Sequence, residues 1–201
     1  MAKQKRDTRK PASGRLRIVA GKWRSRLLPV ADVAALRPTA ERIRETLFNW
    51  LAPVIEGAKC LDLFAGSGAL GFEALSRGAA ATHFVENAPQ AVQLLRQNIA
   101  ALEADNATLL SADALAWLQA ATAEQYDIVF LDPPFAADYY EELCRLLATR
   151  RWLSGNARIY LEQERDQPLP ELPDGWKVLK AKTAGNVRYA LLEAANPRSS
   201  E

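Results

Sequence analysis

The sequence is poor in the residues that build disulfides and metal sites. It contains two cysteines, Cys60 and Cys144, far apart and without metal-ligand spacing, and one histidine, His83. We therefore expect reduced cysteines, no disulfide and no bound metal. No segment approaches the roughly 20 apolar residues needed to cross a bilayer, and no apolar signal core follows the basic N-terminus. These absences predict a cytoplasmic protein with no role at a membrane, which we expect to be a monomer.

Basic charge is concentrated at one end of the chain. Residues 1–30 hold ten Lys and Arg against one acidic residue, Asp7, so their net charge is +9 although that of the whole chain is +2. A basic arm on an acidic body favours a polyanionic partner, and nucleic acid is the commonest one. For residues 1–13, which we expect to be disordered, a merely solubilising tail is the alternative. The candidate nucleic-acid contacts are Arg15, Arg17, Lys22, Arg24, Arg26 and Arg37.

Strand and helix patterns alternate from Lys59 onward. This alternation predicts an α/β, Rossmann-like fold with a mostly parallel seven-stranded sheet, covered on both faces and closed by a C-terminal antiparallel hairpin. A small basic β-hairpin, turning at Gly21-Lys22, and a helix precede it. The expected strands span 15–20, 23–28, 60–64, 81–86, 107–111, 126–131, 157–162, 177–182 and 187–193, and the expected helices span 39–51, 69–77, 89–102, 114–121 and 139–148. The expected parts are a disordered basic tail (1–13), an N-terminal extension (14–53), the main domain (54–195) and a second disordered tail (196–201).

A glycine-rich turn follows the first strand of the main domain. Gly66, Gly68 and Gly71 spell G-x-G-x-x-G, which lets the backbone approach a nucleoside cofactor but does not by itself identify that cofactor. Asp62 lies just before the turn, where a carboxylate could help fix a cationic amino-acid moiety, directly or through water. This favours S-adenosylmethionine, which carries an ammonium and a sulfonium, over NAD, which would place a pyrophosphate there.

Two more carboxylates end the next two strands. Glu86 is placed to accept hydrogen bonds from two ribose hydroxyls, and its alternative is an exposed charge at a strand end. Asp113 could accept the adenine amine while the next N–H donates to the ring, and its alternative, which can hold at the same time, is a helix N-cap. The predicted cofactor-binding residues are Asp62, Phe64, Ala65, Gly66, Ser67, Gly68, Glu86, Asn87, Asp113, Ala114 and Asp132.

The tetrapeptide Asp132-Pro133-Pro134-Phe135 closes the apolar strand 126–131. Proline lacks a backbone N–H and cannot extend a ladder, so the carbonyls of Asp132 and Pro133 should not take part in sheet pairing at the C-terminal edge, where α/β proteins bind ligands. A carboxylate, a carbonyl and an aromatic ring together suit a planar base with an exocyclic amine. The alternative is a strand that ends in a turn with a hydrophobic plug.

Together these motifs resemble the class I S-adenosylmethionine-dependent methyltransferases that modify exocyclic amines, and more narrowly the RsmD family of bacterial 16S rRNA guanine-N2 methyltransferases. The resemblance covers residues 15–193. It rests on segments 17–24, 37–39, 42–51 and 61–68 and on Asp132-Pro133-Pro134-Phe135. It implies methyl transfer to guanine N2, of the type that acts on guanine 966, with S-adenosylhomocysteine as product. It also implies 16S rRNA as partner, within an assembled or assembling small subunit.

The resemblance also implies roles for the catalytic candidates Asp132, Pro133, Pro134 and Phe135. The Asp132 carboxylate and the Pro133 carbonyl would accept the two amine N–H groups, and Phe135 would stack on a base taken out of its helix. The basic residues of the extension would hold RNA phosphates. The alternatives are an adenine-N6 DNA methyltransferase, a protein-glutamine methyltransferase, an NAD-dependent oxidoreductase and a non-catalytic rRNA-binding assembly factor.

Overall fold

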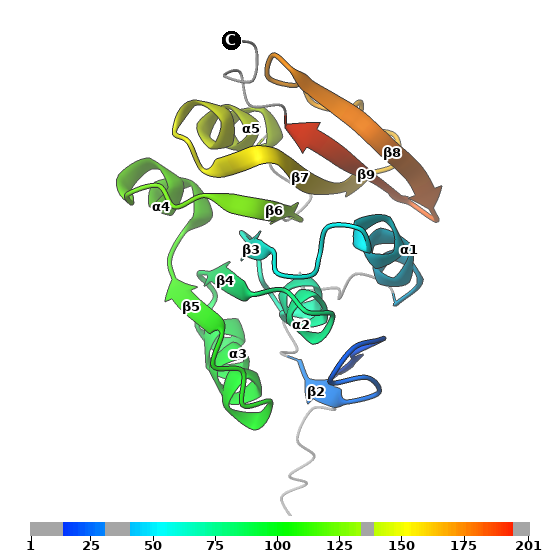
Figure 1. The fold of residues 1–201 in the computed structure, drawn as a ribbon, viewed down its shortest axis with the longest axis vertical. Coiled ribbons are helices and arrows are strands. Elements are labelled where there is room, and N and C mark those ends of the chain that lie inside the picture. Colours follow the sequence, from blue (N-terminus) through cyan, green and yellow to red (C-terminus); the bar gives the residue numbers. More distant parts are fainter. Residues whose placement is uncertain (1–13, 31–40, 134–138, 195–201) are drawn as a thin grey trace, which may run out of the picture.

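One seven-stranded sheet forms the centre of the computed structural model, which describes residues 14–30, 41–133 and 139–194 (Figure 1). The strand order is β5-β4-β3-β6-β7-β9-β8, and β9 is antiparallel to both of its neighbours while the other pairs are parallel. The strands are β3 Lys59–Asp62, β4 Ala81–Glu86, β5 Ala107–Ser111, β6 Tyr126–Leu131, β7 Leu153–Glu164, β8 Trp176–Ala184 and β9 Val187–Ala194. The predicted fold class is confirmed.

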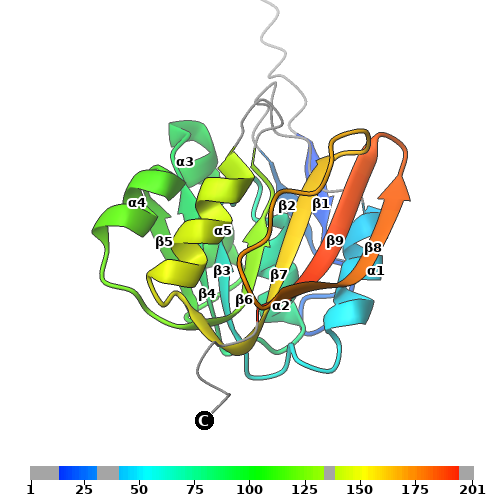
Figure 2. The same ribbon diagram turned by 90° about the horizontal axis from the view of Figure 1, so that it is seen from above.

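Five helices are described, and they cover both faces of the sheet (Figure 2). They are α1 Glu41–Leu51, α2 Ala69–Ser76, α3 Pro89–Ala101, α4 Ala114–Ala120 and α5 Tyr139–Thr149. Side chains alternate between the faces, so Phe130 packs in the core under α1, α2 and α3, while Val129 and Leu131 pack under α4 and α5. The burial of these two apolar layers is the main force that holds the sheet between its helices.

The predicted basic hairpin has a different shape in the structure. Only β1 Arg15–Arg17 and β2 Leu27–Pro29 pair, and residues 18–26 connect them, so the predicted two-residue turn was wrong. The connection has backbone hydrogen bonds of its own, such as that from the Ile18 N–H to the Arg26 carbonyl over 3.0 Å, and it also bonds to α2: the Lys22 N–H donates to the Ser76 carbonyl over 2.8 Å. Gly21 has a φ of +83°, and a Cβ there would lie 1.7 Å from the same carbonyl oxygen. Only glycine permits this close approach.

The N-terminal segment is part of the main core. Its buried apolar side chains Leu16, Ile18, Leu28 and Val30 belong to the same cluster as Phe130. The Arg44 guanidinium donates to the Arg17 carbonyl over 2.7 Å, and Asn98 donates to the Pro29 carbonyl over 3.1 Å. Residues 14–30 therefore share their stability with the sheet rather than folding as a separate appendage.

Most other boundaries agree with the predictions to within a few residues. The largest difference is β7, which begins at Leu153 and not at residue 157, because its first residue pairs with Tyr126 ahead of an irregularity in the ladder. The predicted tails and the predicted helix start at Thr39 lie outside the described residues. No helix in the described part of the chain has the length and apolar character required to cross a membrane.

Candidate active site

The glycine turn joins β3 to α2. At each of its three glycine positions a side chain would be sterically unfavourable. Gly66 and Gly68 have φ values of 52° and 78°, which L-residues rarely adopt. A Cβ on Gly68 would lie 2.4 Å from the Phe72 ring, and one on Gly71 would lie 2.2 Å from the Phe84 ring. The first two glycines thus shape the turn, and Gly71 lets α2 pack closely against β4.

Asp62 contacts the helix that follows this turn. It is 2% exposed, and its carboxylate accepts the Gly71 N–H in the first turn of α2 over 3.0 Å. Burial raises the pKa of Asp62 to about 7, against the effect of this hydrogen bond and with a smaller contribution from the negative charge of Glu86. Asp62 is therefore a buried carboxyl group that titrates near neutrality and favours a nearby cation.

Glu86 connects the glycine turn to the start of α3. Its Oε2 accepts the Gly66 N–H over 2.7 Å, and its Oε1 accepts the N–H groups of Asn87 and Ala88 over 2.9 and 2.7 Å. Glu86 is buried, so the alternative of an exposed charge at a strand end was wrong. Its carboxylate holds the backbone of the turn in place.

The remaining cofactor candidates lie in the segment between β3 and α2 or follow β4 and β5. Asp113 caps α4, because its Oδ1 accepts the Ala116 N–H over 3.0 Å, which confirms the N-cap interpretation. The buried Ala114 follows it as the first residue of α4. Ala65 is buried, Phe64 and Ser67 are half-buried, and Asn87 is exposed.

The catalytic candidates follow β6 directly. Asp132 is half-buried and Pro133 is buried, whereas Pro134 and Phe135 lie outside the described residues. Asp62 pairs in register with Phe84 of β4 and Phe130 of β6. The acidic ends of β3, β4 and β6 therefore meet at one edge of the sheet, the C-terminal edge of its parallel strands.

A buried polar cluster beside Asp132 was missed in the sequence. The Tyr160 hydroxyl donates to the Glu162 carboxylate over 2.5 Å, and the Tyr140 hydroxyl donates to the Glu162 carbonyl. Burial raises the pKa of both tyrosines, and the negative charge of Asp132 contributes in each case. The sequence feature that could have indicated this cluster is Glu162 itself, a charged residue at the end of a mostly apolar strand.

Three of the predicted nucleic-acid contacts, Lys22, Arg24 and Arg26, lie away from this edge. Arg15, Arg17, Lys22, Arg24 and Arg26 are all exposed, and Arg37 lies outside the described residues. The connection that carries Lys22, Arg24 and Arg26 docks on Ser76, the last residue of α2, and Arg26 donates to the carbonyl of Ala101, the last residue of α3. These helices end at the N-terminal edge of the strands, so the three cations lie opposite Asp132.

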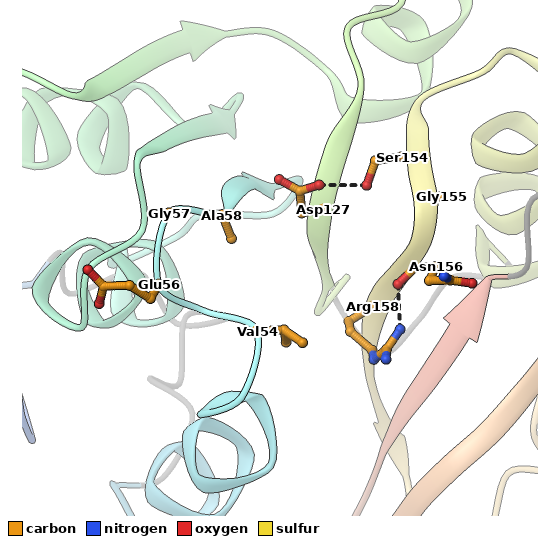
Figure 3. Close-up of a pocket in the computed structure, with 9 residues that line it drawn as sticks. All are labelled: Val54, Glu56, Gly57, Ala58, Asp127, Ser154, Gly155, Asn156 and Arg158. Carbon is orange, nitrogen blue, oxygen red and sulfur yellow. Dashed lines mark hydrogen bonds between the residues drawn. The ribbon is translucent and has the colours of Figure 1, made fainter.

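A surface hollow also lies at the N-terminal edge (Figure 3). The residues that line it are Val54, Glu56, Gly57, Ala58, Asp127, Ser154, Gly155, Asn156 and Arg158. Asp127 accepts the Lys59 N–H over 2.9 Å and the Ser154 hydroxyl over 2.6 Å, and Arg158 forms an ion pair with Glu193 over 2.8 Å. Asp127 and Arg158 therefore serve the fold, and the hollow lies at the opposite edge of the sheet from the glycine turn.

The strand order, the glycine turn and the acidic strand ends define a class I methyltransferase fold. The solved structure described as "Putative methyltransferase yhhF from Escherichia coli" has this fold, with a TM-score of 0.85 and 46% sequence identity over 91% of this chain and 99% of that one.

The family follows from sequence similarity. Residues 16–193 match the family described as "Conserved hypothetical protein 95". The curated relatives include "Ribosomal RNA small subunit methyltransferase D" of Escherichia coli strain K12, 49% identical over 90% of this chain and 91% of that protein. The protein of the same name from Haemophilus influenzae is 45% identical over 90% of this chain and 95% of its own length. The chain belongs to this family, the RsmD family of methyltransferases.

Proposed function

We propose that this protein transfers a methyl group from S-adenosylmethionine to the exocyclic N2 of a guanine in 16S rRNA. The observation that carries the proposal is the acidic C-terminal edge, where Asp132 and Pro133 follow β6 beside the glycine turn. Relatives that cover nine tenths of the chain are named as small-subunit rRNA methyltransferases, which favours rRNA over the DNA and protein alternatives. We further propose that it acts in the cytoplasm as a monomer, on the small subunit or its assembly intermediate.

The residues of the turn suit this cofactor chemically. Asp62 offers a buried carboxyl group to an ammonium, and Asp113 offers a second carboxylate to an adenine amine at the end of β5. Glu86 already accepts three backbone N–H groups, and a carboxylate has roughly four acceptor positions. It can therefore take one ribose hydroxyl in this conformation, and a second one requires a backbone N–H to be released.

S-adenosylmethionine, when bound, supplies an electrophilic methyl group. The protein has to improve a poor nucleophile, because the N2 lone pair of guanine is delocalised into the ring. Hydrogen bonds from the amine to the Asp132 carboxylate and the Pro133 carbonyl would favour tetrahedral nitrogen. The carboxylate would also offset the positive charge that develops there, which is the type of interaction that usually contributes most to catalysis. Holding the amine at near-attack distance supplies much of the remainder.

The test is to identify the methylated nucleoside. The protein is incubated with labelled S-adenosylmethionine and either free 16S rRNA or small subunits from a strain that lacks the enzyme, and the RNA is digested to nucleosides. We expect the label in N2-methylguanosine. Label in N6-methyladenine, with DNA preferred as substrate, would contradict the proposal. Binding to rRNA without any transfer would favour the assembly-factor alternative.

A further inference from the structure

One row of residues crosses the sheet at the level of Asp132. Leu131 pairs with Leu161, so the residues that follow them, Asp132 and Glu162, lie one step further along β6 and β7. Glu162 pairs with Tyr189 of β9, and Tyr189 pairs with Lys182 of β8. At roughly 4.8 Å between strands, the row spans about 14 Å. It begins at the proposed acceptor site and ends at a lysine on the outermost strand.

This lysine belongs to a small basic and aromatic surface. Trp50 of α1 stacks on Tyr189 with ring centroids 5.4 Å apart, and the Lys182 ammonium lies 6.0 Å from the centre of the Trp50 ring. Lys180 pairs with Leu191, which packs in the same core cluster as Tyr189, so both lysines project from the α1 face of the sheet. We call Lys180, Lys182 and Trp50 the β8 surface.

The lysines of the β8 surface differ from a neighbour on the same strand. Both are exposed, and neither forms an ion pair within the described ranges. Lys177, further from the C-terminal edge, pairs with Glu193 over 2.7 Å and is neutralised locally. Two unpaired ammonium groups next to a half-buried tryptophan are suited to phosphates and bases of single-stranded RNA.

The position of three of the hairpin cations leaves room for a second contact nearer to Asp132. Lys22, Arg24 and Arg26 lie at the N-terminal edge, and α2 alone, at about 1.5 Å per residue, separates that edge from the glycine turn by about 12 Å. RNA phosphates bound by these three cations alone would lie at the edge of the sheet opposite Asp132. Resting on the proposed function, we propose that the β8 surface is a second RNA-binding surface, which holds rRNA phosphates at the edge where Asp132 receives the base.

The test is the salt dependence of rRNA binding by a charge-removing double variant, Lys180→Gln with Lys182→Gln. Each lost phosphate contact should flatten the slope of log K against log salt by roughly 0.7–0.9. The matched control is Lys177→Gln, on the same strand and face, which should leave the slope unchanged. The double variant Lys180→Arg with Lys182→Arg should restore it. Affinity for S-adenosylmethionine should be the same in all variants.

A different role for these lysines predicts a different result. Lysines on an edge strand can simply prevent edge-to-edge pairing between molecules. In that case the Gln variant would self-associate in analytical ultracentrifugation while its salt slope stayed that of the wild type, and the inference would be wrong. Nucleoside mapping on the wild type distinguishes failure of the β8 surface proposal from failure of the proposed function. If the wild type methylates guanine and the slope does not change, only the β8 surface fails, whereas a wild type that does not bind rRNA overturns both.

Discussion

At both edges of the sheet, carboxylates accept backbone N–H groups, but the backbone that they hold has a different role at each edge. At the C-terminal edge, the carboxylates of Asp62 and Glu86 accept backbone N–H groups from the glycine turn, from α2 and from the residues just before α3. Towards the opposite edge, Glu73 accepts the N–H groups of Val19 and Ala20, and Asp127 accepts that of Lys59. In each case a carboxylate accepts backbone N–H groups that would be costly to leave unpaired.

The difference between the edges therefore does not lie in the carboxylates. The edges differ in the role of the backbone that the carboxylates hold. The amides held at the C-terminal edge belong to a turn that can receive a cofactor, next to a strand that ends in Asp132-Pro133. Those held towards the opposite edge belong to the N-terminal segment and to the start of β3, which complete the core. Position relative to the ends of the parallel strands separates binding from structural carboxylates.

The largest expected effect is on stability, from Glu73→Ala. Glu73 is 1% exposed, accepts two N–H groups from the N-terminal segment and pairs with Arg77 over 2.7 Å. Removing one partner of a buried ion pair costs roughly 3–5 kcal/mol. Denaturant unfolding should show this loss, while Glu142→Ala, which breaks an exposed pair with Arg145, should leave the unfolding free energy unchanged. Similar small losses in both variants would contradict the structural role of Glu73.

Glu86→Ala should weaken cofactor binding at the C-terminal edge. Charge-assisted hydrogen bonds are worth roughly 1.5–3 kcal/mol each, so the loss of one to ribose should lower affinity about tenfold to a hundredfold. Because Glu86 also holds the Gly66 and Ala88 amides, Glu86→Gln serves as the control that keeps an acceptor in place. Isothermal calorimetry with S-adenosylmethionine measures the loss. Unchanged affinity in the Ala variant would mean that Glu86 only orders the turn.

Asp62 should make cofactor binding depend on pH. Its pKa, raised by burial to about 7, means that the carboxyl group is about half protonated in the free protein near pH 7. A cationic ligand group beside it favours the carboxylate, so affinity should rise with pH through about 7 and binding should release a proton. Asp62→Asn should flatten this dependence. Calorimetry in two buffers of different ionisation enthalpy counts the proton, and equal release by the Asn variant would exclude Asp62 as its source.

The same titration should affect folding with the opposite sign. An unfolded Asp ionises near its ordinary pKa, below that of the folded group, so the unfolded state loses its proton first as the pH rises. The stability associated with Asp62 is therefore fully present at low pH and is lost as the pH rises through about 7. Urea unfolding across this pH range should show the decline in the wild type and a weaker one in Asp62→Asn.

The smallest expected effect is that of removing residues 1–13. They precede Gly14, the first described residue, and carry basic charge without apolar periodicity. Most methyl transfer should survive, because the exposed cations of residues 15–26 remain on a segment that is anchored to the core. Loss of nearly all transfer would mean that the tail itself grips the substrate.

Local patterns were sufficient to predict the sheet, the helices and the four carboxylates at or just after strand ends, Asp62, Glu86, Asp113 and Asp132. The hairpin was mispredicted because Gly21-Lys22 is typical of a tight turn, whereas its geometry depends on Glu73 and Ser76, more than 50 positions away. Glu162 was missed for a similar reason. Its hydrogen bond with Tyr160 and its place beside Asp132 follow from the pairing of β6 with β7, which periodicity does not specify.

The most direct test compares two aspartates at opposite ends of β6. Asp132 follows the last residue of the strand, and Asp127 lies near its start, where it bonds to Lys59 and Ser154. Methyl transfer from labelled S-adenosylmethionine to small subunits is measured for Asp132→Ala and Asp127→Ala, with cofactor affinity measured for both. The account predicts that Asp132→Ala lowers turnover by about 100-fold or more with cofactor affinity nearly unchanged, whereas Asp127→Ala retains turnover. Normal turnover in Asp132→Ala, or an equal loss in Asp127→Ala, would contradict it.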